Sequence, residues 1–169
     1  ERMCATFARH YQADVTILRV FNVYGTLLSH QVASTVEAIF VRRVLQGLPP
    51  VIQSHPQEGR DFIYITDVIR AIHLALEAGK GLQVLNIGSG VMTTLYELAQ
   101  LVIAIAGAPL TPLIQTREAE GSTATNERPM QLQADIRRAQ QALGFQPQVS
   151  LCQGLTELFE ALRGSERPA

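Results

Sequence analysis

The sequence predicts an α/β fold, in which strands and helices alternate along the chain. The residues Val15–Gly25 form a near-continuous apolar run, which suits a strand buried on both faces of a parallel sheet. Segments with helical spacing of apolar residues lie between this run and shorter apolar runs. Glycines close several of these segments, as they commonly do at helix ends. Such alternation is typical of the α/β class.

The first part of the chain is predicted to begin inside a helix, because Met3, Phe7 and Tyr11 share one helical stripe. A globular protein seldom starts in this way, so we expect the chain to be the C-terminal piece of something longer. The later helix ends at Gly47, which Leu-Pro-Pro follows. The elements predicted up to residue 65 are helices over 1–12 and 32–47 and strands over 15–25, 51–53 and 62–65.

The second part of the chain begins with a helix that Thr66 is expected to cap. Thr94 and Glu97 have the spacing of a capping box, which opens a helix that runs to Ala106. Gly144 and Ser150 are read as a helix end and a helix cap. The apolar stripe of the first helix is Val68, Ile69, Ile72, Ala75 and Leu76. The other predicted elements are strands over 83–87 and 113–115 and helices over 134–143 and 151–162.

The composition is that of a water-soluble globular protein, with 47% hydrophobic and 17% charged residues. The net charge of −1 offers no basic field for nucleic acid. No apolar run is long enough for a membrane span. Cys4 and Cys152 have no ligand spacing and suit a reducing compartment, which favours the cytoplasm. The Arg42–Arg43 pair is interpreted as part of a solvated helix face.

Several catalytic signatures are absent from the sequence. Lys80 is the only lysine, and Leu76 stands four residues before it, so no Tyr-x-x-x-Lys pair exists in this chain. No Cys/His spacing would hold zinc. The Gly-Ser-Gly at 88–90 follows a strand, but Thr93 replaces the third glycine of a dinucleotide fingerprint. It is a weak signal for a phosphate cradle and a strong one for a tight turn.

Asn22 and Arg60 are the two polar residues with a possible binding role. Asn22 lies near the end of an apolar strand, where an unpaired amide would cost about 1–3 kcal/mol. It is either a satisfied structural amide or a ligand contact beyond the carboxyl end of a parallel strand. Arg60 is either a rigid donor for a diphosphate or the partner of Glu58 or Asp61 in a local ion pair.

Four motifs in order resemble those of a known family. LRVFNVYG (18–25), RDFIYITDV (60–68), NIGSG (86–90) and ADIRRAQQALGFQPQVSLCQGL (134–155) are similar to the C-terminal half of extended short-chain dehydrogenase/reductases. These enzymes are NAD-dependent sugar-nucleotide epimerases and dehydratases of the UDP-galactose 4-epimerase type. The resemblance implies the C-terminal part of a Rossmann-like NAD(P)-binding fold plus a mixed α/β sugar-nucleotide-binding region. It also implies that the chain begins just after the catalytic lysine.

The resemblance also implies roles for particular residues. Phe21 and Asn22 correspond to the segment that passes the nicotinamide of NAD, and Asn22 also to a substrate contact. Arg60 corresponds to the arginine that binds the substrate diphosphate. Asp61 and Tyr64 correspond to structural residues of the same strand. The remaining implied substrate contacts are Val51 and Gln53 at the base pocket and a second diphosphate arginine, for which Arg128 is the first candidate and Arg117 the other.

The resulting expectation is a substrate-binding portion of an NAD-dependent epimerase or dehydratase that is inactive alone. Residues 1–169 form one domain or domain fragment, with 1–30 as the last part of the Rossmann sheet and 31–169 as the substrate-binding region. The expected partner is a nucleoside-diphosphate sugar, with no nucleic acid and no membrane. The alternative is a non-catalytic module that binds a nucleotide or a partner. Self-association into a homo-oligomer is expected in either case.

Overall fold

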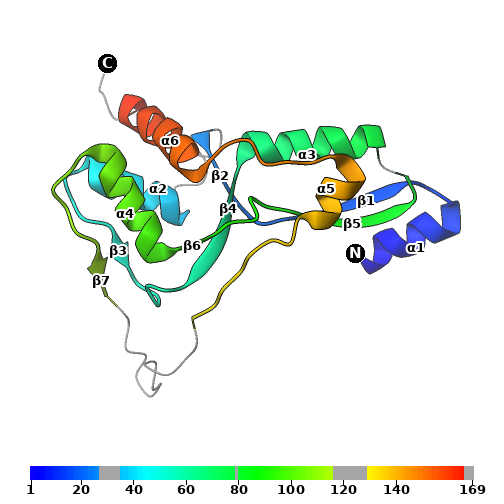
Figure 1. Ribbon diagram of the computed structural model, residues 1–169, viewed down its shortest axis with the longest axis horizontal. Helices are drawn as coiled ribbons and strands as arrows, with labels where there is room; N and C mark the ends of the chain where they lie inside the picture. Colours follow the sequence, from blue (N-terminus) through cyan, green and yellow to red (C-terminus); the bar gives the residue numbers. More distant parts are fainter. Residues whose placement is uncertain (27–34, 79, 116–128, 166–169) are drawn as a thin grey trace. The chain divides into compact units, whose positions relative to one another are not determined.

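The computed structural model describes residues 1–26, 35–78, 80–115 and 129–165, in which helices and strands alternate along the chain (Figure 1). This alternation confirms the predicted α/β class. The chain divides into two compact units, each assembled from three separate segments. Unit 1 contains 1–23, 61–91 and 133–150, and unit 2 contains the described residues of 24–60, 92–132 and 151–169. The boundary predicted at residue 30 lies outside the described residues.

Unit 1 is built on two parallel strands, β1 (Val15–Val20) and β5 (Leu82–Ile87). Their register runs from the pair Val15–Leu82 to the pair Val20–Ile87, which confirms the predicted parallel sheet. Helix α1 (Arg2–Tyr11) contacts both strands, α3 (Ile65–Ala78) contacts β1, and α5 (Arg137–Leu143) contacts β5 and α3. Within the described chain the first four residues of β1 are partly buried, and Arg19 and Val20 are exposed. The predicted burial on both faces is therefore wrong for β1, because among the described strands only β5 pairs with it.

The core of unit 1 lies between these strands and the helices α3 and α5. Leu85, Ile87 and Phe145 are completely or almost completely buried. The other members of this core are Ile63, Val68, Ala71, Ala139 and Leu143.

The predicted apolar stripe of α3 is wrong in part. Val68 is buried, together with Ala71, which the prediction omitted. Ile69, Ile72 and Leu76 are 38%, 44% and 79% exposed. The stripe is wider than the surface that β1 and α5 cover, so only its Val68 side enters the core. Thr66 is not a helix cap, because α3 already begins at Ile65, directly after strand β4.

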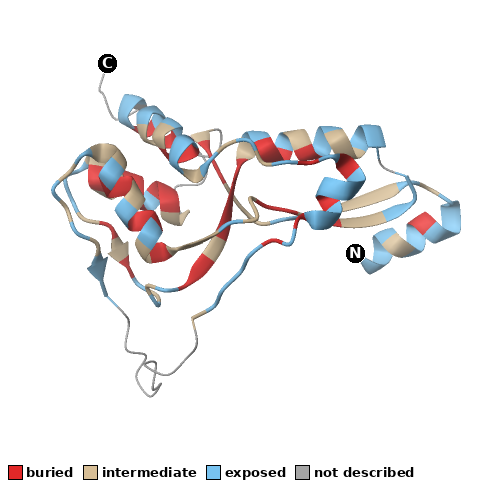
Figure 2. Cartoon of the chain, in the orientation of Figure 1, coloured by how far each residue is buried: buried red, intermediate tan, exposed pale blue. Residues whose placement is uncertain are grey.

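Unit 2 is built on three helices that pack against one another: α2 (Val36–Leu45), α4 (Leu95–Ala106) and α6 (Leu151–Ser165). Phe40, Leu98 and Leu155 are buried, and Figure 2 shows buried residues on each of these three helices. The predicted capping box of α4 is present. Thr94 Oγ1 accepts from the Glu97 amide at 3.2 Å, and Glu97 Oε2 accepts from the Thr94 amide at 2.8 Å. This last bond is the main reason why the pKa of Glu97 is lowered.

The remaining strands are short. The two strands β3 (Val51–Ile52) and β7 (Leu113–Ile114) pair in parallel. A further sheet has the order β2 (Asn22–Tyr24), β4 (Gly59–Tyr64) and β6 (Met92–Thr94). The apolar run predicted as one strand at 15–25 is therefore interrupted at Phe21. No helix in the described ranges is long and apolar enough to cross a bilayer.

Candidate functional site

A pocket of about 410 Å³ lies within unit 2. Three residues implied as substrate contacts by the resemblance, Val51, Gln53 and Arg60, lie together in its wall. Its apolar surface suits a planar or sugar ring, and its two arginines suit an anionic group. The lining residues come from α2, β3, β4 and the start of α4: Val36, Ile39, Phe40, Arg43, Val51, Ile52, Gln53, Ser54, Arg60 and Leu95.

Arg60 is the second residue of β4 and faces both a carboxylate and the pocket. Its Nε and Nη2 atoms both donate to Oε1 of Glu58, at 2.8 and 2.5 Å. The Glu58 side chain is 11% exposed and that of Arg60 is 32% exposed. The predicted local ion pair is therefore formed with Glu58. Because a guanidinium has five N–H groups, this pair fixes Arg60 without using all of its donors.

Arg43 is a second arginine in the pocket wall, although the Arg42–Arg43 pair was predicted to lie on a solvated helix face. Its Nε atom donates to the carbonyl oxygen of Pro49 at 2.7 Å. The prediction was wrong for this residue because it treated the Arg42–Arg43 pair as one unit. The spacing of Val36, Ile39, Phe40 and Arg43 along α2 follows one helical face and was the signal that could have found it.

Glu37 is a buried acid in the first turn of α2, and it was not singled out in the sequence. It is 4% exposed. Burial raises the pKa of its carboxyl, while hydrogen bonds from Thr35 and from its own amide, and the charge of Arg60, oppose this increase. The raised pKa means that the folded chain binds a proton at Glu37 more tightly than the unfolded chain does.

The buried acid predicts a pH dependence of stability. Because the folded pKa is raised, Glu37 contributes to the free energy of unfolding at low pH. That contribution is lost as pH rises from the ordinary value of 4.5 through the folded pKa. Glu37→Gln is therefore expected to unfold at higher urea concentration than the wild type at pH 7.5, but not at pH 4. Glu77→Gln, on the exposed side of α3, is the control. Equal pH slopes for Glu37→Gln and the wild type would contradict this expectation.

Phe21 and Asn22, the expected cofactor contacts, lie at the end of β1 and the start of β2 in unit 1. The Asn22 side-chain amide donates to the carbonyl oxygen of Asp61 at 3.0 Å. The Phe21 backbone amide donates to the carbonyl oxygen of Ile87 at 2.9 Å. The expectation that the amide of Asn22 needs a partner is confirmed. A ligand contact by either residue stays a prediction.

The Gly-Ser-Gly turn at 88–90 is bound to a carboxylate of its own chain. Asp61 is completely buried. Its Oδ1 atom accepts from the amide and hydroxyl of Ser89, both at 2.7 Å. Its Oδ2 atom accepts from the amides of Gly90, at 2.9 Å, and Ala134, at 3.1 Å. Because these amides are already engaged, the turn does not fit a dinucleotide diphosphate. The structural roles expected for the turn and for Asp61 are confirmed.

The close packing around the turn gives a second stability prediction. A Cβ atom added at Gly88 would lie 2.4 Å from Cβ of Ala134 and 2.9 Å from Oδ2 of Asp61. Gly88→Ala is therefore expected to lower the free energy of unfolding by about 2 kcal/mol, as overpacking commonly does. Gly164→Ala is the control, because a Cβ atom at Gly164 would meet no atom within 4 Å. Gly107→Ala is less suitable, since the φ of Gly107 is +61°, a conformation that alanine rarely adopts. If Gly88→Ala and Gly164→Ala unfold at the same urea concentration, the packing argument is wrong.

The second diphosphate arginine expected from the resemblance cannot be placed. Arg128 and the alternative Arg117 both lie outside the described residues. Arg60 and Arg43 are the arginines that line the pocket within the described part of the chain.

Comparison with known proteins supports the resemblance. The model of the NAD dependent epimerase/dehydratase family matches residues 1–88, which is more than half of the chain. The chain belongs to the NAD-dependent epimerase/dehydratase family. A UDP-glucose 4-epimerase of Mycolicibacterium smegmatis is 31% identical over 93% of this chain and 48% of its own length. UDP-glucuronic acid decarboxylase 3 of Arabidopsis thaliana is 28% identical over 96% of this chain and 45% of its own length.

Solved structures of sugar-nucleotide epimerases are also similar to this member of the epimerase/dehydratase family. UDP-glucose 4-epimerase from Thermotoga maritima, solved with UDP-glucose, has a TM-score of 0.81 and 34% identity over 96% of this chain and 50% of that chain. UDP-glucuronic acid 4-epimerase from Bacillus cereus, solved with UDP-glucuronic acid and NAD, has a TM-score of 0.79 and 27% identity over 97% and 50%. The chain thus spans about half the length of these relatives.

Proposed function

We propose that this chain supplies the sugar-nucleotide-binding part of an NAD-dependent epimerase or dehydratase. The pocket in unit 2 carries the proposal, because it brings Val51, Gln53 and Arg60 into one wall. Arg60 is held at the pocket by Glu58, so little side-chain freedom is lost when it binds a diphosphate. The apolar residues of α2 then contact the base or the sugar. Two structural relatives were solved with UDP-glucose and with UDP-glucuronic acid, which supports a nucleoside-diphosphate sugar as the ligand.

Nucleotide binding tests this proposal directly. UDP-glucose is expected to raise the melting temperature of the 169-residue chain, and calorimetry gives its affinity. Arg60→Ala is expected to weaken the binding of UDP-glucose about tenfold or more, because a charge-assisted hydrogen bond contributes roughly 1.5–3 kcal/mol. Arg137→Ala removes an arginine of unit 1 whose side chain is 80% exposed and serves as the control for loss of charge. The proposal fails if UDP-glucose gives no stabilisation, or if Arg60→Ala binds as tightly as the wild type.

The chain by itself is proposed to be catalytically inactive. Its only lysine, Lys80, has Leu76 four residues before it, so it carries no Tyr-x-x-x-Lys acid/base pair. Phe21 and Asn22 are the proposed contacts to the nicotinamide of NAD. The amides of Ser89 and Gly90 in the Gly-Ser-Gly turn already donate to Asp61, so they are not proposed to bind the diphosphate of NAD. Incubation with NAD and UDP-glucose, followed by chromatography of the nucleotide sugars, is expected to give no product. Turnover would contradict the proposal.

The alternative function is a non-catalytic module that binds a nucleotide or a partner protein. Exposed apolar side chains favour it: Met3, Phe7 and Tyr11 of α1 are 86%, 53% and 65% exposed, although they share one stripe. Such a stripe is suited to a protein contact. We propose self-association through it, in the cytoplasm, where the free thiols Cys4 and Cys152 suit a reducing environment. Light scattering that finds a monomer at high concentration would contradict self-association.

A further inference from the structure

We propose that Arg43 is a second oxyanion-binding residue of the pocket in unit 2. The inference rests on the proposed binding of a nucleoside-diphosphate sugar. Arg43 is not among the substrate contacts that the resemblance implies. The shared chemistry of its ligand is an oxyanion, which a sugar nucleotide presents in its diphosphate and, in a uronic acid sugar, also in a carboxylate.

The backbone around α2 holds the Arg43 guanidinium at the pocket. Arg43 lies one helical turn after Phe40 and two turns after Val36, and all three side chains line the same pocket. Its Nε donates to the carbonyl of Pro49 at 2.7 Å, two residues before β3, which also lines the pocket. This bond uses the donor nearest the stem. Among the described residues the side-chain hydrogen bond of Arg43 is the one to Pro49, so the terminal Nη groups, which give the planar fork its ability to bind phosphate or carboxylate, can bind a ligand.

The two pocket arginines differ in how their charge is compensated. Arg60 forms an ion pair with Glu58. Glu37, the acid on the same helix as Arg43, interacts with the charge of Arg60. Among the residues that the structure describes, no carboxylate lies within ion-pair distance of Arg43, whose hydrogen bond goes to a neutral carbonyl. A positive charge without a carboxylate partner, in a partly apolar pocket, attracts an oxyanion more strongly than a paired one.

Arg42 provides a matched control. It precedes Arg43 on α2 and carries the same charge, but it is not among the residues that line the pocket. Glutamine at either position keeps a long stem and a similar helix propensity, so both variants remove one positive charge from the same helix, and only Arg43→Gln changes a residue that lines the pocket.

The first experiment measures binding of inorganic pyrophosphate, UDP-glucose and UDP-glucuronic acid by calorimetry. Arg43→Gln is expected to bind pyrophosphate about tenfold more weakly than the wild type, and Arg42→Gln to bind it equally well. A similar loss for both nucleotide sugars assigns Arg43 to the diphosphate. A loss confined to UDP-glucuronic acid assigns it to the sugar carboxylate. Arg43→Gln binding all three ligands as tightly as the wild type overturns the inference, as does a wild type that binds none of them.

These outcomes separate the inference from the proposed function. If pyrophosphate binds and Arg43→Gln weakens it, but neither nucleotide sugar binds, the inference stands and the proposed function fails. If UDP-glucose and UDP-glucuronic acid bind to the wild type and to Arg43→Gln alike, the proposed function stands and the inference fails.

A second experiment needs no variant that could unfold. NMR of the ¹⁵N-labelled wild-type chain follows the Nε–H signals of the arginine side chains. The hydrogen bond to Pro49 protects the Nε–H of Arg43 from exchange with water, so its signal is expected to be visible. Pyrophosphate is expected to shift the signals of Arg43 and Arg60 but not that of Arg42. A shift of Arg60 alone overturns the role of Arg43.

Discussion

Asp61→Ala is expected to lower the free energy of unfolding by about 4 kcal/mol, which is a large part of the roughly 5–15 kcal/mol that stabilises a typical domain. The wild-type carboxylate is completely buried and accepts from the amides of Ser89, Gly90 and Ala134 and from the Ser89 hydroxyl. Removing it leaves three amides without their acceptor, while the Ser89 hydroxyl keeps the Val91 carbonyl as an acceptor at 3.2 Å. A buried unpaired donor costs about 1–3 kcal/mol. Urea unfolding followed by circular dichroism measures the loss.

Two further variants make the test of Asp61 specific. Asp61→Asn keeps the shape but turns an NH₂ group toward one set of donors, so it is expected to lose nearly as much stability as Asp61→Ala. Asp135→Asn changes an acid whose side chain is 55% exposed and is expected to stay within about 0.5 kcal/mol of the wild type. If Asp61→Asn and Asp135→Asn have equal midpoints, Asp61 does not hold the turn.

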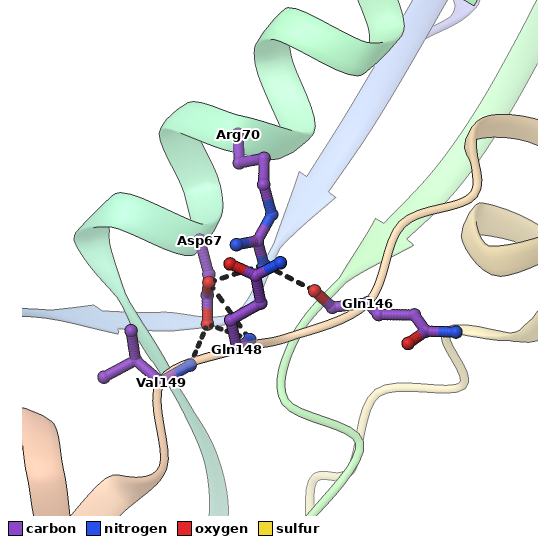
Figure 3. Close-up of polar contacts among 5 residues, drawn as sticks. All are labelled: Asp67, Arg70, Gln146, Gln148 and Val149. Atoms are coloured by element: carbon purple, nitrogen blue, oxygen red, sulfur yellow. Dashed lines mark hydrogen bonds and ion pairs between the residues drawn. The ribbon is translucent and has the colours of Figure 1, made fainter.

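Asp67→Ala is expected to have the next largest effect, a loss of about 3 kcal/mol. Asp67 is also completely buried. Figure 3 shows its carboxylate between Arg70 of α3 and the segment at 146–149. It accepts from the amides of Gln148, at 3.0 Å, and Val149, at 3.1 Å, and pairs with Arg70 at 2.7 Å. Arg70 in turn donates to the Gln146 carbonyl.

The signature of this loss is local. Hydrogen exchange should accelerate at Gln148 and Val149 in Asp67→Ala, because their amides lose their acceptor. The amide of Gly90, which is bound to Asp61, is the internal reference. Unchanged protection at Gln148 and Val149 would show that Asp67 does not hold this segment. Arg70→Ala, which leaves both amides their acceptor, is expected to lose less stability than Asp67→Ala.

Sequence patterns predicted the elements well where the local signal and the packing agree. Thr94 and Glu97 are three residues apart, and this spacing alone specifies a capping box, which the structure contains. The burial of the residues in α3, the helix after β4, was harder to predict. Its stripe includes Ile69, Ile72 and Leu76, but which apolar residues of a wide stripe enter a core depends on the surfaces of other elements, and these are distant in sequence. Thr66 has a capping side chain, but no pattern shows that strand β4 continues into α3 without a break.

The residues of the candidate site that the family resemblance implied could be predicted from the sequence. Val51, Gln53 and Arg60 were identified from motif order, and all three line the pocket. Arg43 was not identified, because a pair of arginines on a helix is usually solvated. Only its position on the same helical face as Val36 and Phe40 distinguishes Arg43 from Arg42. The partners of Asp61 were also out of reach, because Ser89, Gly90 and Ala134 come from two distant segments. The contacts proposed for Phe21, Asn22 and Arg128 stay predictions.

The three-segment construction of each unit has a consequence for how the chain folds. Synthesis from the N-terminus delivers β1 long before β5, its parallel partner, and delivers α2 long before α6. Neither unit can close until its third segment has left the ribosome, which begins at residue 133 in unit 1 and at residue 151 in unit 2. Contacts between residues far apart in sequence slow folding and leave apolar segments unpaired in the meantime. Refolding from urea should therefore be slow for a chain of this size, and chaperones that shield nascent apolar segments should raise its yield.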